Sequence, residues 1–155
     1  MLKLYTPKYT DLWFRKLILA DQNTMEYNHK YGGTIDFNES KWNEWFSKWV
    51  DNKSKDRFYR YLLEEDSNEY VGEVAYRFDE DRKIYIASII VYFKYRKNGY
   101  GKIGLQLLCE AAKTNGIDYL YDDIAIDNKA VNLFINNGFV ERYRNDEIIM
   151  LKKKL

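Results

Sequence analysis

The segment from residue 83 to residue 126 constrains the fold more than any other part of the chain. Its two ends (83–93 and 116–126) are apolar runs rich in β-branched and aromatic side chains, which is typical of strands. Between them, the apolar residues Ile103, Leu107 and Ala111 follow the spacing of an amphipathic helix. Two strands that are joined through a helix are parallel neighbours in a sheet. The sequence therefore predicts a β-α-β unit.

The patterns on either side extend this unit into an α/β (α+β) fold. Residues 57–78 alternate with a period of two around a short polar turn, which favours an antiparallel hairpin. We expect a mixed, mostly antiparallel sheet of six or seven strands with helices on both faces. In chain order, the expected elements are a strand at 2–6, helices at 10–20 and 38–50, strands at 57–65, 69–78 and 83–93, a helix, a strand at 116–126, a short helix at 128–138 and a final hairpin of strands at 139–144 and 147–153.

Composition narrows the class of protein. The 155 residues, 46% of them hydrophobic, suit a single domain over residues 1–155. Lys and Arg number 25 and Asp and Glu 24, so a net charge of +1 argues against nucleic acid or an anionic membrane as partner. One cysteine and one histidine exclude an internal disulfide and disfavour a metal site. Charges run through the first 20 residues and no apolar run approaches about 18 residues, so we expect a cytoplasmic protein.

A basic loop with two glycines lies between the strand at 83–93 and the helix that follows it. Glycine lets backbone amides approach a ligand closely, and the N–H groups that begin a helix have no acceptor within it. Such a loop binds phosphate, although a basic surface turn has the same composition. Gly104 completes a G-x-G-x-x-G spacing, but no acidic residue closes the next strand as a dinucleotide site requires. The loop residues are Arg96, Lys97, Asn98, Gly99, Tyr100, Gly101 and Lys102.

Two signatures in this region resemble those of the GNAT N-acetyltransferases. The stretch "IIVYFKYRKNGYG" is similar to V-x-P-x-Y-R-x-x-G-x-G, with Phe93 in place of the proline. About thirty residues later, "DNKAVNLFINNGF" is similar to N-x-A-x-x-L-Y-x-x-x-G-F, with Phe134 where tyrosine is commoner. The resemblance covers about residues 84 to 140. The matching positions are Val91, Tyr95, Arg96, Gly99 and Gly101 in the first signature, and Asn128, Ala130, Leu133, Gly138 and Phe139 in the second.

This resemblance implies a splayed sheet that binds acetyl-CoA and needs no metal. The pyrophosphate would lie on the amides of residues 96–101, with Lys102 adding charge. The strand residues Ile89, Ile90 and Val91 would run beside the pantetheine arm. Asn128 would reach the same arm, and Phe134 would lie near the thioester sulfur.

The acid–base residues do not follow from the resemblance. The position of the usual glutamate base is Ile86, and the position of the usual tyrosine acid is Phe134. An amine with an ordinary pKa near 10.4 has to lose a proton before it attacks. Glu73, Asp123 and Tyr143 are candidates for these roles, although each of them also suits a solvated, ion-paired or packed position.

The acceptor site is expected to be built from the first two helices, the loop between them and the final hairpin. Tyr27, His29 and Tyr31 of that loop, with Asp122 of the strand at 116–126, suit a positively charged ligand. An ordered loop with packed rings has the same composition. The stripe formed by Trp42, Trp45, Phe46 and Trp49 favours a core position.

The sequence therefore predicts an N-acetyltransferase that acts on a primary amine of a small molecule. The alternatives are acetylation of a protein N-terminus or lysine, and a non-catalytic acetyl-CoA-binding module. Basic and aromatic residues alternate at 93–102 as in a single-strand nucleic-acid binder, but the charge balance argues against that class. The high aromatic content, 17%, is compatible with a homodimer.

Overall fold

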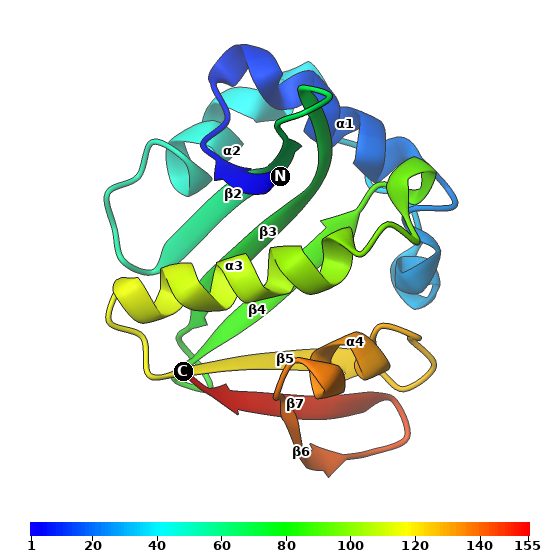
Figure 1. Cartoon of the computed structure of the whole chain (residues 1–155), viewed down its shortest axis with the longest axis vertical. Helices are drawn as coiled ribbons and strands as arrows, with labels where there is room; N and C mark the ends of the chain where they lie inside the picture. The colour runs from blue at the N-terminus through cyan, green and yellow to red at the C-terminus, as the bar shows by residue number, and fades with distance from the viewer.

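The computed structural model describes residues 1–155, and its seven strands form one sheet (Figure 1). The strand order is β1-β2-β3-β4-β5-β7-β6, and every neighbouring pair is antiparallel except β4 and β5. This confirms the mixed, mostly antiparallel sheet and the β-α-β unit. The strands are β1 (Leu2–Tyr5), β2 (Arg57–Glu64), β3 (Glu69–Asp79), β4 (Ile84–Val91), β5 (Tyr119–Ala125), β6 (Val140–Arg144) and β7 (Ile148–Lys154).

Four α-helices and four 3-10 turns complete the fold. The last helix is shorter than expected because Asn128 Oδ1 accepts a hydrogen bond from the Ala130 N–H, which holds residues 128–130 in a turn ahead of the helix. No helix combines the length and the apolarity that crossing a bilayer requires. The helices are α1 (Leu12–Ala20), α2 (Trp42–Trp49), α3 (Tyr100–Thr114) and α4 (Val131–Asn136), and the turns are η1 (Tyr9–Asp11), η2 (Glu26–Tyr31), η3 (Glu39–Lys41) and η4 (Phe93–Tyr95).

The sheet carries a separate core on each face, because successive side chains of a strand point to opposite sides. On β2, Phe58 and Leu62 face α3 and α4, whereas Tyr59 and Tyr61 face α1 and α2. The four aromatic residues of the α2 stripe are half-buried against the second core, as the sequence predicts. Cys109 is buried in the first core.

Strands β4 and β5 separate along most of their length. Their only paired residues are Ile86 and Tyr121, whereas β4 stays paired with β3 through Val91 and β5 stays paired with β7. Figure 1 shows the two strands meeting at one end and diverging toward α4, with α3 crossing in front. Each strand is held by its outer neighbour, so the sheet opens in the middle without losing either half.

Glycine 104 brings α3 close to the open strand. A Cβ at this position would lie 2.7 Å from Leu62 Cδ1 and 3.2 Å from Ile89 Cδ1. Any larger side chain would therefore push the helix away from the sheet. This packing role accounts for the third glycine of the G-x-G-x-x-G spacing.

Candidate active site

A cleft of about 810 Å³ fills the opening between β4 and β5. Its size suits the inner part of a cofactor-sized molecule. It is lined from four directions: β4, the loop and first turn of α3, the inner side of β5 with the segment up to α4, and η2. Of the residues expected from the sequence to bind cofactor or acceptor, it contains Ile89, Ile90, Val91, Arg96, Lys97, Gly99, Tyr100, Gly101, Lys102, Asn128, Phe134, Tyr27, Tyr31 and Asp122, together with Asp123.

The loop before α3 forms a cradle of backbone amides at one end of this cleft. Lys97 and Gly99 both have left-handed backbone conformations, with φ of 67° and 78°. Asn98 Nδ2 donates to the carbonyl oxygens of Tyr95 and Arg96, so the side chain holds the preceding carbonyls in place. The first N–H bonded within α3 is that of Ile103, to Gly99. The three N–H groups at positions 100–102 are therefore free to bind an anion.

The cradle is also open because Gly101 has no side chain. A Cβ there would lie 3.3 Å from Leu133 Cδ2 and 3.9 Å from Val91 Cγ2, in the narrow space between the helix start and the cleft walls. Gly99 serves a different purpose, because no atom lies within 4 Å of its Cβ position. It supplies the left-handed turn that starts the helix.

Along the cleft, the edge of β4 carries peptide groups that are not bonded to a neighbouring strand. The Tyr92 N–H donates to Val71 on β3, and Ile90 O lies beside Gly72 on the same strand. Because peptide groups alternate in direction along a strand, those of Ile89 and Val91 point the other way, toward the opening. Val91 O accepts a hydrogen bond from Arg96 Nε at 3.1 Å, which agrees with this direction.

Arg96 adds positive charge to the cleft and also links two of the segments that surround it. Besides Val91, its guanidinium donates from Nη2 to Thr24 O at 3.0 Å, so it ties the loop after α1 to the loop after β4. Burial lowers the pKa of Arg96 from its usual value. The side chain is therefore partly committed to the protein backbone, and the amide cradle provides the remaining anion contacts.

Asn128 and Phe134, from the second of the two GNAT-like signatures, lie on the wall of the cleft opposite β4. Asn128 uses Oδ1 to accept the Ala130 N–H, which leaves its Nδ2 as the donor available to the cleft. Phe134 is 1% exposed and packs edge-on against Phe139, with ring centroids 5.0 Å apart. It contributes an apolar surface and no proton.

The two aspartates of β5 differ in their surroundings. Asp123 pairs with Arg82, whose Nη1 lies 3.0 Å from Oδ2. Asp122 points to the opposite face, as Leu120 and Ile124 do, and forms no ion pair. Burial, with a smaller contribution from the charge of Asp123, holds the pKa of Asp122 well above the usual value of an aspartate. A carboxyl group whose pKa is raised in this way is a candidate for proton transfer.

The 3-10 turn η2 covers the cleft on the side of α1 and α2. Tyr27 and Tyr31 line it, and Tyr31 is 74% exposed at the rim. Burial and the charge of Glu73 raise the pKa of Tyr27 to about 12, so its hydroxyl remains protonated. His29 does not line the cleft: it contacts Asp127 on the segment that follows β5. The two sides of the opening are thereby joined.

Glu73 lies beneath this region rather than in the cleft. It is 5% exposed, and Arg15 Nη1 donates to both of its carboxylate oxygens, at 2.8 and 2.7 Å. Tyr59 donates its hydroxyl to the same carboxylate. Arg15 is itself enclosed by rings, with its Cζ 4.5 Å from the Trp45 ring centroid. Arg15 was not expected from the sequence, because no local pattern announces a partner 58 residues away.

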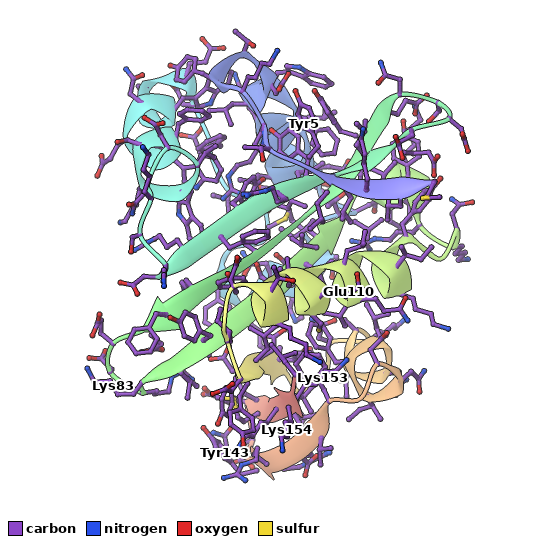
Figure 2. All side chains as sticks on the ribbon, turned by 60° about the vertical axis from the view of Figure 1, so that its left-hand side comes forward. Tyr5, Lys83, Glu110, Tyr143, Lys153 and Lys154 are labelled. Carbon is purple, nitrogen blue, oxygen red and sulfur yellow. The ribbon has the colours of Figure 1, made fainter.

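Tyr143 lies far from the cleft. It is 51% exposed on β6, the edge strand, and β7 separates it from β5. Figure 2 shows it at the lower end of the molecule, and its partner across the hairpin is Met150 of β7. The structure therefore does not position Tyr143 to protonate a leaving group. Ile86, at the usual base position, is buried where β4 still pairs with β5.

The sequence profile of the Acetyltransferase (GNAT) family matches residues 15–139, which include the amide cradle, both walls of the cleft and η2. The chain belongs to this family. Its members are acetyltransferases that use acetyl-CoA, so the chain is an enzyme of the acyltransferase class. A search of curated protein sequences found no match.

Solved structures of the family share the fold over the whole chain. Spermidine N-acetyltransferase from Vibrio cholerae, in complex with CoA and spermine, has a TM-score of 0.79 at 17% identity, covering 99% of this chain and 95% of that one. An acetyltransferase of the GNAT family from Streptococcus pneumoniae has a TM-score of 0.77 at 17% identity, covering 100% of both chains. The GNAT domain of S. lividans PAT has a TM-score of 0.78 at 12% identity, covering 99% and 89%.

The residues of the cleft fit acetyl-CoA on two independent grounds. The amide cradle at 100–102, flanked by Lys97 and Lys102, suits a pyrophosphate. The outward peptide groups of Ile89 and Val91 suit the amides of an extended arm, which would add to the sheet as a strand does. When bound there, acetyl-CoA supplies an activated acyl group.

Proposed function

We propose that the chain transfers the acetyl group of acetyl-CoA to a primary amine on a small, positively charged molecule. The observation that carries this proposal is Asp122, a carboxylate without an ion pair in the floor of the cleft. It lines the same cleft as the amide cradle, Tyr27 and Tyr31. The proposal treats residues 1–155 as one catalytic domain, in the cytoplasm expected from the sequence.

Binding of the acceptor follows from the charges and rings of the cleft. An ammonium group would be attracted by Asp122 and by the ring faces of Tyr27 and Tyr31. The basic residues of the cleft lie mainly at the other end, around the amide cradle. This division favours a cationic acceptor at one end and an anionic cofactor at the other.

Proton transfer is assigned to Asp122, directly or through one water. A carboxylate with a raised pKa is a stronger base than an ordinary aspartate, so it suits the removal of a proton from the bound ammonium. The neutral amine then forms the new C–N bond as the C–S bond breaks. The Ile89 N–H, which points into the opening, would donate to the carbonyl oxygen as negative charge develops. A thiol has an ordinary pKa near 8.5, so the CoA thiolate can leave without protonation by an acid. This is compatible with Phe134, which has no proton to donate at the usual tyrosine position.

A small acceptor is favoured over a protein because of the cover on the cleft. The turn η2 lies over the opening, and the contact between His29 and Asp127 closes one side of it. A peptide chain would have to displace this segment. A polyamine belongs among the substrates tested because one structural relative is named as a spermidine N-acetyltransferase.

The test is an amine panel of polyamines, amino acids, amino sugars and arylalkylamines, scored by the release of free thiol from acetyl-CoA. With the best acceptor, Asp122→Asn is expected to lower kcat by about 10²- to 10⁴-fold while CoA affinity is kept. Asp123→Asn is the matched control and should retain most of the rate. An unchanged rate in Asp122→Asn would remove the assigned base. CoA binding without thiol release from any amine would identify a non-catalytic module.

A further inference from the structure

A second cavity, of about 590 Å³, lies at the end of the sheet where β1 and the start of β3 meet α1. Figure 2 shows Tyr5 of this region beside β1, at the opposite end of the molecule from Tyr143. We call it the aromatic pocket. It is defined by Tyr5, Trp13, Glu69, Tyr70, Tyr92 and Tyr95.

The walls of the aromatic pocket are ring faces and ring edges. Tyr70 lies at the centre, with its ring centroid 5.3 Å from that of Tyr5 and 5.9 Å from that of Trp13. Tyr92 and Tyr95 lie against each other at 5.8 Å. A pocket that is lined by several aromatic rings and a carboxylate is the arrangement by which proteins bind ammonium groups.

One aromatic side chain of the pocket wall does not belong to the hydrophobic core. The α1 residues that are buried in the second core are Leu12, Phe14, Ile18 and Leu19. Trp13 projects from the helix outside this set and is 52% exposed. Trp13 therefore borders the cavity without being needed to fill the core.

Carboxylates hold the tyrosine hydroxyls of the pocket and make the rings richer in electrons. Tyr5 donates its hydroxyl to Asp11 Oδ2 at 2.7 Å, and Tyr95 donates to Glu69. Both phenols remain protonated, because these hydrogen bonds raise the pKa of each. The negative charges lie at the hydroxyl ends, so they add to the attraction of the ring faces for a cation.

The chain already places one of its own cations here. Lys94 Nζ lies 5.4 Å from the centroid of the Tyr95 ring. Lys94 is exposed and borders the pocket, so its ammonium group competes with a bound cation for the same ring face.

From these features we propose that the aromatic pocket binds a small organic cation with a methylated nitrogen. This site goes beyond the proposed transfer reaction. A quaternary nitrogen has no N–H and cannot be acetylated, so such a ligand is not an acceptor for the cleft. The two sites share Tyr95, which lines both cavities.

The test uses the full chain without acetyl-CoA and titrates it with choline. Its neutral isostere 3,3-dimethylbutan-1-ol, in which carbon replaces the nitrogen, is titrated in parallel. The proton resonance of the methyl groups should move upfield and saturate for choline, because the bound methyl groups lie over ring faces. The isostere is expected to bind about tenfold more weakly or not at all. Equal affinities, or no saturable shift for choline, would overturn the proposal.

Variants locate the bound cation. Trp13→Ala and Glu69→Gln should each weaken choline binding by about tenfold. Lys94→Ala should strengthen it, since a competing charge is removed. Tyr31→Ala, at the rim of the acetyl-transfer cleft, should have no effect. A loss of binding in Tyr31→Ala with none in Trp13→Ala would place the cation in the cleft and refute the aromatic pocket. Glu69 lies on the surface, so its variant remains informative if Trp13→Ala folds poorly.

Discussion

The imidazole of His29 joins the two sides of the acetyl-transfer cleft through Asp127, with Nε2 lying 3.2 Å from Oδ2. The other ring nitrogen, Nδ1, lies 2.9 Å from Glu26 O. The ring is thus held at both nitrogens, by a backbone carbonyl oxygen on one side and by a carboxylate on the other. Because His29 belongs to η2 and Asp127 follows β5, this contact fixes the cover over the opening relative to its floor.

We predict that His29→Ala alters acceptor binding more than stability. The two side chains are 46% and 47% exposed, so their pairing contributes at most about 1 kcal/mol to folding. Loss of the contact leaves the longer ion pair of Lys30 Nζ with Asp127 Oδ1, at 3.9 Å, between η2 and this segment. The turn is then held less firmly, and Tyr27 and Tyr31 with it, so KM for the amine should rise severalfold while kcat changes little. Steady-state kinetics and thermal unfolding measure the two effects. Asp127→Asn should reproduce them, and a large loss of stability in either variant would contradict this assignment.

A second prediction concerns the ion pair between Arg15 and Glu73, whose side chains are 17% and 7% exposed. Glu73→Gln leaves the guanidinium buried without a counter-charge, so the free energy of unfolding should fall by about 3–5 kcal/mol. Denaturant titration measures this loss. Enzyme that remains folded should keep its kcat, because Glu73 does not line the cleft.

The matched control for this pair is the double variant Arg15→Met, Glu73→Leu. Removing both charges together avoids the unpaired ion, so most of the stability should return. A Glu73→Gln variant of normal stability with a strongly reduced rate would instead show that Glu73 acts as the base.

The raised pKa of Asp122 predicts how the rate depends on pH. The carboxyl group accepts a proton only when it is ionised, so kcat should rise with pH as Asp122 loses its proton. Because burial raises the pKa, this rise should come at a higher pH than for an ordinary aspartate. A pH profile of kcat with the best acceptor checks it, and Asp122→Asn should lose this limb. If kcat of the wild type and of the variant rose over the same pH range, Asp122 would be excluded as the group that titrates.

The same pKa shift predicts an opposite effect on stability. Above the unfolded pKa the unfolded chain releases the proton of Asp122 while the folded chain retains it, so the folded state loses relative stability as pH rises to the folded pKa. Asp122→Asn removes this penalty. The variant should unfold at a higher temperature than wild type near neutral pH, and the difference should disappear in acid, below the unfolded pKa.

A fifth prediction separates charge from space in the amide cradle. Gly101→Asp and Gly101→Asn introduce side chains of nearly equal size beside the free N–H groups at 100–102. The aspartate should weaken CoA binding by at least about tenfold more than the asparagine, because its charge opposes the pyrophosphate. Calorimetric titration with CoA measures both. Equal affinities would show that the pyrophosphate does not lie on this cradle.

Much of the architecture was open to prediction because it depends on short-range patterns. The period-two runs, the polar turns between them and the helix between residues 83 and 126 correctly predicted the strand order along the chain and the parallel pair β4–β5. The glycines at 99 and 101 marked the loop after β4, and the structure shows two separate reasons: a left-handed turn at Gly99 and the close approach of Leu133 at Gly101.

The assignment of acids and bases could not be predicted in the same way. Glu73 and Asp122 are both acidic residues within strands. The sequence does not reveal that Glu73 forms an ion pair with Arg15, whereas Asp122 forms none. Tyr143 is a tyrosine on a predicted strand, and only the sheet order places that strand at the far edge.

The sequence by itself determined the elements, their order and the amide cradle, because hydrophobic period, glycine conformation and helix capping act between residues close along the chain. Only the tertiary structure decided which carboxylate lies free in the cleft, how His29 reaches Asp127, and that rings from β1, α1, β3 and η4 enclose a second cavity. Those outcomes depend on contacts between residues tens of positions apart. Their desolvation and pairing are fixed only when the sheet and its helices have packed together.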